Sequence, residues 1–300
     1  MPPATARKRK PSVSIIGLGR LGQAMAIALD AAGYPLRALV GRPDQHVPVG
    51  ADEFAQLPPT NLILITTPDD AIAQVATRLA AIETRRIRRP TVLHTSGALS
   101  SAVLLPLAAA GFHTGSLHPL VSVSEPQAGA KALRGAFYCL EGDRVALRVA
   151  RSIVADLKGK SFAINPESKA LYHAAAVMAS PHLVALFDLA TELLASCGLN
   201  KKSARQILLP LIESTTNNLS AFTPEKALTG TFARGDIATV HRHLAALKAL
   251  LSLPNSQLVE ALEVYRLLGR HSLQLAEKNG LDPQLLNRLR KLLEASSDVA

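Results

Sequence analysis

The sequence predicts an α/β fold, in which a doubly wound, mostly parallel sheet is followed by an all-α C-terminal domain. Up to residue 165, short apolar runs alternate with helical patterns, whereas from about Glu167 strand signals vanish and helical patterns continue nearly to the end. Alternating strands and helices are typical of a parallel sheet covered by helices. We therefore predict a basic disordered leader at 1–11, an α/β domain at 12–165 and an all-helical domain at 166–300.

The first predicted strand, at 13–16, runs into the glycine-rich turn Gly17-Leu-Gly19-Arg-Leu-Gly22 and a helix that ends at Gly33, and a second strand follows at 36–40. This β-α-β order with G-x-G-x-x-G spacing is the Rossmann dinucleotide-binding pattern. Gly17 permits the tight turn, Gly19 lets the backbone approach a pyrophosphate, and Gly22 lets the helix pack on the sheet. The helix N-terminus then faces the phosphates. The alternative is a structural turn that happens to be rich in glycine.

The end of the second strand indicates which dinucleotide binds. An NAD site has Asp or Glu there, but this chain has Val40-Gly-Arg42-Pro43. A guanidinium can grip a 2′-phosphate that a carboxylate would repel, so NADP(H) is favoured, with Arg42 as the first candidate and Arg20 as the second. The alternative is that Arg42 is an exposed loop cation. The remaining predicted cofactor contacts are Leu21, Thr67 and Pro68.

The rest of the chain continues the two patterns. An apolar strand at 61–67 precedes a helix that opens at Pro68-Asp69-Asp70, and a strand at 91–97 precedes a helix through about 110. Further strands are predicted at 112–118, 137–140 and 162–164. Helices are predicted at about 167–197, 201–220, 236–252, 255–279 and 283–296, separated by Gly and Pro.

Composition excludes several classes of protein. The formal charge of +10 includes two basic runs, Arg7 to Lys10 and Arg85 to Arg89, which we interpret as a leader and a solvated helix end. With no Trp and 4% aromatic residues, stacking platforms are scarce, so we expect no nucleic-acid partner. No apolar stretch reaches the length of a membrane span and no signal peptide follows the basic start, so no membrane partner is expected.

Cysteine and histidine usage points to the cytoplasm and away from metals. Two cysteines, Cys139 and Cys197, provide no disulfide framework and fit a reducing compartment. They are too far apart for a zinc knuckle, and no histidine pair has a recognisable ligand spacing, so we expect no metal site.

Polar residues cluster where two predicted strands end. His94, Thr95 and Ser96 end one strand, and Ser116 and His118 end another. We expect these residues to bind a substrate carboxylate or carbonyl beside the nicotinamide, since ligands of such sheets lie outside the carboxyl ends of the strands. The alternative is that they satisfy backbone groups of the loops.

The helical region adds a second group of candidates. Lys169 and His173 are four residues apart on one helix face, with Tyr172 beside them. A lysine that lines a cleft on an apolar helix can have a lowered pKa and act as a proton donor, whereas the alternative is an exposed first-turn lysine. Further on, Arg234 is a candidate carboxylate clamp and Asp236 a helix cap in the same substrate region; the alternative is a structural turn between helices.

Four ordered blocks carry a family resemblance: His94-Thr-Ser-Gly97, Ser116-Leu-His-Pro119, Lys169-Ala-Leu-Tyr-His-Ala-Ala-Ala176, and Ala227-Leu-Thr-Gly230 with Ala233-Arg-Gly-Asp236. They resemble a largely uncharacterised bacterial family that joins a Rossmann-like NADP-binding domain to a C-terminal helical domain of unknown function. Its architecture is similar to ketopantoate reductases, pyrroline-carboxylate reductases and 6-phosphogluconate or β-hydroxyacid dehydrogenases. The resemblance covers Val13 to about Asn279.

The resemblance implies an NADP-dependent reductase, often a homodimer through the helical domain. The proton-donor lysine of β-hydroxyacid dehydrogenases and ketopantoate reductases corresponds to Lys169, whereas the asparagine that follows it in the former is His173 here. The leading hypothesis is therefore reduction of a small anionic keto acid, ketopantoate first, with Lys169 as general acid oriented by His173, and with Ser96, His118 and Arg234 holding the substrate. The alternatives are a pyrroline-type imine reductase and a sensor or scaffold that binds NADP without turnover.

Overall fold

A computed structural model describes residues 10–41, 49–50, 57–83, 89–251 and 258–294. Contacts within the chain divide it into two compact units, Met1–Ser180 and Pro181–Ala300. The boundary that we predict at 165/166 stays a prediction. By its contacts, the helix that begins at Lys169 belongs to the first unit. The predicted leader, apart from residues 10 and 11, lies outside the described residues.

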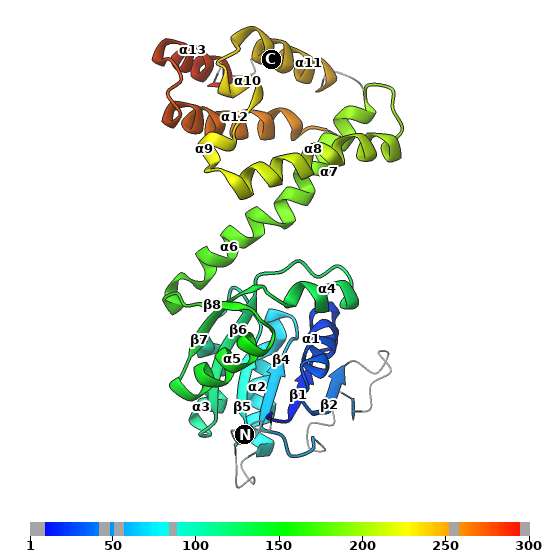
Figure 1. Ribbon diagram of the computed structural model, residues 1–300, viewed down its shortest axis with the longest axis vertical. Coiled ribbons are helices and arrows are strands. Elements are labelled where there is room, and N and C mark those ends of the chain that lie inside the picture. Colours follow the sequence, from blue (N-terminus) through cyan, green and yellow to red (C-terminus); the bar gives the residue numbers. More distant parts are fainter. Residues whose placement is uncertain (1–9, 42–48, 51–56, 84–88, 252–257, 295–300) are drawn as a thin grey trace, which may run out of the picture. The chain divides into compact units, whose positions relative to one another are not determined.

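The first unit is built on one sheet of eight described strands in the order β3-β2-β1-β4-β5-β6-β7-β8 (Figure 1). The strands are β1 (Val13–Ile16), β2 (Leu36–Gly41), β3 (Val49–Gly50), β4 (Leu62–Ile65), β5 (Thr91–His94), β6 (His113–Pro119), β7 (Phe137–Gly142) and β8 (Lys160–Phe162). All neighbouring pairs are parallel except β6 and β7. The predicted doubly wound, mostly parallel sheet is therefore confirmed, and the strand order reverses between β1 and β4, where such folds bind ligands.

Helices cover both faces of this sheet. They are α1 (Arg20–Ala31), α2 (Asp69–Glu83), α3 (Leu105–Ala109), α4 (Pro126–Leu133) and α5 (Arg144–Asp156). The first unit also includes α6 (Lys169–Ala179), which contributes no side chain to the two apolar cores of the sheet. One apolar core contains side chains of α1, α4 and α5, and a second contains side chains of α2 and α3. The central strands β1 and β4 are buried throughout, as expected for apolar runs between two helical layers.

The second unit is entirely helical within the described residues. It contains α7 (Pro181–Ala195), α8 (Lys201–Ala221), α9 (Pro224–Ala227), α10 (Gly230–Ala233), α11 (Ile237–Leu251), α12 (Ala261–Lys278) and α13 (Pro283–Glu294). Its buried core lies mainly among α11, α12 and α13, while α7 and α8 pack against each other. The predicted helix at 167–197 is interrupted at Ser180, because Pro181 starts a new helix and the residue before a proline avoids helical geometry.

One segment corrects an expectation from the sequence. Pro166–Ala195 is long and apolar enough, by length and composition alone, to cross a membrane, and 6% of its most apolar window is buried. Lys169, near the start of this segment, is nevertheless buried in a polar network on the sheet. Such a network is incompatible with lipid around that end of the segment.

Candidate functional site

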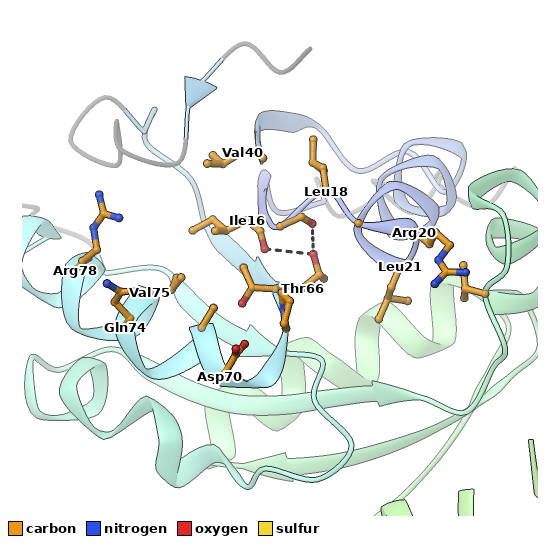
Figure 2. Close-up of a pocket in the computed structure, with 17 residues that line it drawn as sticks. Ile16, Leu18, Arg20, Leu21, Val40, Thr66, Asp70, Gln74, Val75 and Arg78 are labelled. Atoms are coloured by element: carbon orange, nitrogen blue, oxygen red, sulfur yellow. Dashed lines mark hydrogen bonds between the residues drawn. The ribbon is translucent and has the colours of Figure 1, made fainter. Parts of the chain in front are cut away.

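A cavity of about 710 Å³ opens at the carboxyl ends of β1 and β4, where the strand order reverses (Figure 2). The predicted cofactor residues Gly17, Gly19, Arg20, Leu21, Thr67 and Pro68 all line it. Gly22 lies behind it and contacts the turn. The structure therefore brings the described members of this predicted set together at one cavity, and their role in cofactor binding stays a prediction.

The glycine turn has the geometry that a phosphate requires. Gly17 has φ +100°, a conformation that favours glycine, and Thr66 Oγ1 donates a hydrogen bond to its carbonyl oxygen (Figure 2). Gly19 caps α1, and its position has no neighbour within 4 Å of where a Cβ would be. The first turn of α1 contains no acidic residue, so its N–H groups and positive dipole end are open to an anion.

Cations lie at opposite sides of the cavity. Arg42, the first candidate for a 2′-phosphate contact, lies outside the described residues. Arg20 on α1 and Arg78 on α2 both line the cavity, on opposite sides of it in Figure 2. Arg78 and Gln74 were not among the cofactor residues predicted from the sequence. The signal was present, because Ala71, Gln74, Val75 and Arg78 follow the i, i+3, i+4, i+7 spacing of one helix face directly after β4.

Lys169 is the centre of a second polar cluster. Its side chain is 1% exposed, so the alternative of an exposed first-turn lysine is wrong. Nζ donates hydrogen bonds to the Ser96 carbonyl oxygen (3.1 Å) and to Ser116 Oγ (2.9 Å). Burial lowers the pKa of Lys169, and the nearby acidic groups Cys139, Glu141 and Asp69 oppose this effect. Lys169 therefore connects the residues that follow β5 with the end of β6, where the sequence predicts a cluster of polar residues.

Ser96 connects this cluster to the cofactor cavity. Its Oγ donates to Asp69 Oδ2 (2.8 Å), and Asp69 directly follows Pro68, which lines the cavity. Ser96 Oγ also accepts hydrogen bonds from the amides of Ala98 and Leu99. The Ser96 hydroxyl therefore satisfies loop backbone groups, which is the alternative interpretation for this residue.

Two strand-end histidines are held neutral. His94 is fully buried and accepts a hydrogen bond from the Ser96 amide at Nδ1, and burial with the Lys169 charge lowers its pKa to about 3. His118 is half-buried, and the same two causes, with a smaller effect of His173, lower its pKa to about 4. Neither ring carries a proton charge at neutral pH.

His118 and the aromatic groups of α6 form one contact network. His118 Nδ1 lies 2.6 Å from the Tyr172 hydroxyl, whose pKa is raised by burial. The rings of His118 and His173 meet edge to face at 5.7 Å between centroids. The structure therefore brings Lys169, Tyr172, His173 and His118 together, as the sequence analysis expects of substrate-site residues.

Arg234 and Asp236 belong to the helical unit and lie between α10 and α11. Arg234 is exposed at the end of α10. Asp236 caps α11 by accepting hydrogen bonds from the Thr239 amide (3.0 Å) and hydroxyl (2.8 Å), and these bonds lower its pKa. This geometry matches the alternative of a structural turn between helices. A substrate role for either residue stays a prediction. Among the described residues, no group of three or more His, Cys, Asp or Glu side chains could hold a metal ion.

Two family profiles together cover most of the chain. Residues 2–119 match the Rossmann-like domain, and residues 136–272 match the domain of unknown function DUF2520. The comparison with curated proteins found no match to the chain.

Solved structures share the fold. A putative NADP oxidoreductase from Bacteroides fragilis is 20% identical over 89% of this chain and 99% of its own, with a TM-score of 0.70. Pyrroline carboxylate reductase from Plasmodium falciparum, solved with NADP bound, is 11% identical over 96% and 97%, with a TM-score of 0.54. An imine reductase from Myxococcus stipitatus in complex with NADP+ is 15% identical over 94% and 93%, with a TM-score of 0.51. The chain therefore joins a Rossmann-like domain to a DUF2520 domain, which confirms the resemblance drawn from its four sequence blocks.

Proposed function

We propose that this chain is an NADP(H)-dependent oxidoreductase that reduces a C=O or C=N bond in a small anionic compound. One observation carries the proposal. The cavity with the phosphate-binding turn is connected through Asp69 and Ser96 to the buried cluster of Lys169, His118 and Tyr172. A hydride donor and a set of proton-carrying groups would thus lie side by side, as such a reduction requires.

The residues of the cavity fit a dinucleotide. The open N–H groups at the start of α1 suit a pyrophosphate, and Arg20 and Arg78 supply cations for further phosphate oxygens. A 2′-phosphate contact of Arg42 or Arg78 would explain a preference for NADP(H) over NAD(H). The names of three structurally similar proteins refer to NADP, which supports the same choice. When bound, the reduced cofactor supplies the hydride.

Two substrate classes remain in view. The activities named for the similar proteins are reductions of pyrroline carboxylate and of imines, which favours a C=N substrate. A keto acid such as ketopantoate is the second candidate, based on the lysine of α6. In either class the positive charge of Lys169 and the basic net charge favour an anionic compound.

The experiment is a screen of NADPH oxidation with purified full-length protein against cyclic imine carboxylates and small keto acids. Lys169→Ala is expected to lower kcat by about 100-fold or more, the usual range for loss of proton-transfer machinery, while NADPH affinity stays nearly unchanged. His113→Ala is the matched control, since His113 is half-exposed in an ion pair with Asp143. Tight NADPH binding without any oxidation would instead identify a sensor or scaffold.

We also propose a homodimer formed through the helical unit. Its helices α7 and α8 expose large apolar side chains, among them Val184 (68%), Ile207 (56%) and Leu211 (63%). Apolar surface of this extent is typical of an interface, and a second copy of the chain would cover it. The buried polar contacts of Lys169 argue against a lipid environment for the start of the apolar segment Pro166–Ala195. We keep the cytoplasm as the proposed location, in line with the free cysteines Cys139 and Cys197.

A further inference from the structure

One face of α6 is held against the sheet by polar contacts within the first unit. Lys169 Nζ donates hydrogen bonds to the Ser96 carbonyl oxygen and to Ser116 Oγ. The Tyr172 hydroxyl lies 2.6 Å from His118 Nδ1. Lys169 and Tyr172 are three residues apart on the helix and therefore share this face. The inner face of α6 is thus already occupied.

The opposite face of α6 is apolar and exposed. Four of its residues follow the i, i+3, i+4, i+7 spacing of a single helix face, and we call them the α6 stripe: Leu171, Ala174, Ala175 and Met178. Leu171 is 76% exposed and Met178 is 70% exposed, and the two alanines between them are exposed as well. A helix of a globular protein buries its apolar stripe, so this face has the character of a contact surface.

The sequence around the α6 stripe carries no formal charge. From Ala170 to Phe187 it contains no Asp, Glu, Lys or Arg. In a two-fold dimer the same patch is presented by both copies, and facing like charges would oppose the contact. An uncharged apolar stripe has no such repulsion. The parts of the sequence outside the described residues are short, and the longest of them, 1–9, is basic, so none of them matches the stripe.

The exposed apolar area is of the size that a stable dimer needs. In addition to Leu171 and Met178, the side chains of Val184, Ile207 and Leu211 on α7 and α8 are more than half exposed. Each of these five side chains offers an apolar area of the order of 100 Å², and together they offer about 500 Å². A stable interface buries about 800 Å² on each partner, of which about 60% is apolar. The two areas therefore agree.

Lipid fits the α6 stripe less well than a protein surface does. A helix that lies on a membrane usually has Lys or Arg on its polar face, where these residues meet anionic headgroups. No Lys or Arg occurs from 170 to 187, and Lys169 is turned into the sheet, where it is 1% exposed. The cation beside the stripe is therefore not available to a lipid headgroup.

We propose that the α6 stripe is a contact surface for a second copy of this chain. This inference rests on the proposed homodimer and extends its interface from α7 and α8 to the helix of the first unit that carries Lys169. An α-helix is about 10 Å across, so only the width of α6 separates the second copy from the polar cluster of Lys169 and Tyr172. The second copy thus borders the proposed reaction site and holds α6 from its outer side.

Photo-cross-linking of the full-length protein tests the contact directly. A benzophenone amino acid in place of Met178 is expected to give a product of twice the chain mass on a denaturing gel, with linked peptides from α6, α7 or α8. The same amino acid in place of Leu105 on α3, which is 67% exposed, is the control and is expected to give no such product. Links confined to one chain would assign the stripe to the protein's own helical unit and overturn the inference.

Charge substitution tests how much the stripe contributes to the dimer. Leu171→Arg combined with Met178→Arg is expected to raise the dissociation constant of the dimer by about 100-fold or more, measured by sedimentation over a dilution series. Arg matches Leu and Met in helix propensity and both positions are exposed, so the circular dichroism and the NADPH affinity are expected to stay as in wild type. Leu105→Arg is the matched control, and Leu171→Met is expected to remain dimeric.

The outcomes separate this inference from the proposals on which it rests. A dimeric wild type whose dissociation constant is unchanged in the double variant would overturn the inference, while dissociation by Val184→Glu would keep the dimer through the helical unit. Flotation with phosphatidylcholine–phosphatidylglycerol vesicles that the double variant loses would assign the stripe to lipid and overturn it as well. A monomeric wild type would overturn both the inference and the homodimer, and NADPH oxidation by that monomer would leave the proposed reductase intact.

Discussion

Alanine substitutions at Gly22 and Gly19 are expected to separate folding of the glycine turn from cofactor binding. At Gly22 a methyl group would lie 2.6 Å from Thr66 Oγ1 and closer still to the Gly17 carbonyl oxygen, so the turn would have to move. At Gly19 a methyl group would meet nothing within 4 Å, and φ −64° suits any residue. Only a bound pyrophosphate would collide with alanine at Gly19.

The magnitudes follow from these contacts. For Gly22→Ala, overpacking costs about 1–3 kcal/mol and loss of the Thr66 hydrogen bond about 1 kcal/mol, so the free energy of unfolding falls by about 2–4 kcal/mol. For Gly19→Ala, weaker capping and a less flexible unfolded chain offset each other to within about 1 kcal/mol. Losing one amide hydrogen bond to a charged phosphate, worth about 1.5–3 kcal/mol, weakens NADPH binding roughly 10- to 100-fold.

The assay combines urea unfolding without cofactor and titration of NADPH fluorescence. Gly22→Ala is expected to change both readings, whereas Gly19→Ala changes only the second. Wild-type NADPH affinity in Gly19→Ala would refute the placement of the pyrophosphate at the start of α1. Unchanged stability in Gly22→Ala would refute the assigned packing of the turn.

Three further outcomes test the cofactor, the buried histidines and the dimer. Arg78→Gln is expected to weaken the binding of NADPH about 10-fold or more and that of NADH little, with Arg144→Gln on α5 as the control. Arg42→Ala is predicted to have the same effect. Equal losses of affinity for both cofactors would contradict a 2′-phosphate contact. The free energy of unfolding is expected to fall as pH drops from 6.5 to 4, because unfolded histidine binds a proton near pH 6.5 whereas folded His118 does so near pH 4. This difference is worth about 3 kcal/mol, and urea unfolding that is equally stable at both pH values would exclude it. Val184→Glu with Leu211→Glu is expected to halve the mass measured by light scattering, unlike Leu105→Glu on α3, and a monomeric wild type would remove the proposed interface.

Local sequence patterns were sufficient for the fold class and the cofactor turn. The apolar runs at β1 and β4 and the glycines between β1 and α1 depend on near neighbours, because strand burial, turn conformation and helix spacing are set within a few residues. The clusters at the ends of β5 and β6 were predictable for a related reason. Once the strands are parallel and adjacent, their carboxyl ends meet at one edge of the sheet.

The tertiary structure alone decided what each of these groups touches. Sequence spacing placed Lys169 and His173 on one helix face, but the burial of Lys169 depends on contacts with Ser96 and Ser116, which lie far away along the chain. The same holds for Arg78, whose place at the cavity follows from the packing of α2 beside β4. Hydrogen-bond partners and burial are properties of residues brought together by folding. The sequence could therefore locate the chemistry at the strand ends, whereas only the structure turned the lysine inward and left the opposite face of α6 exposed.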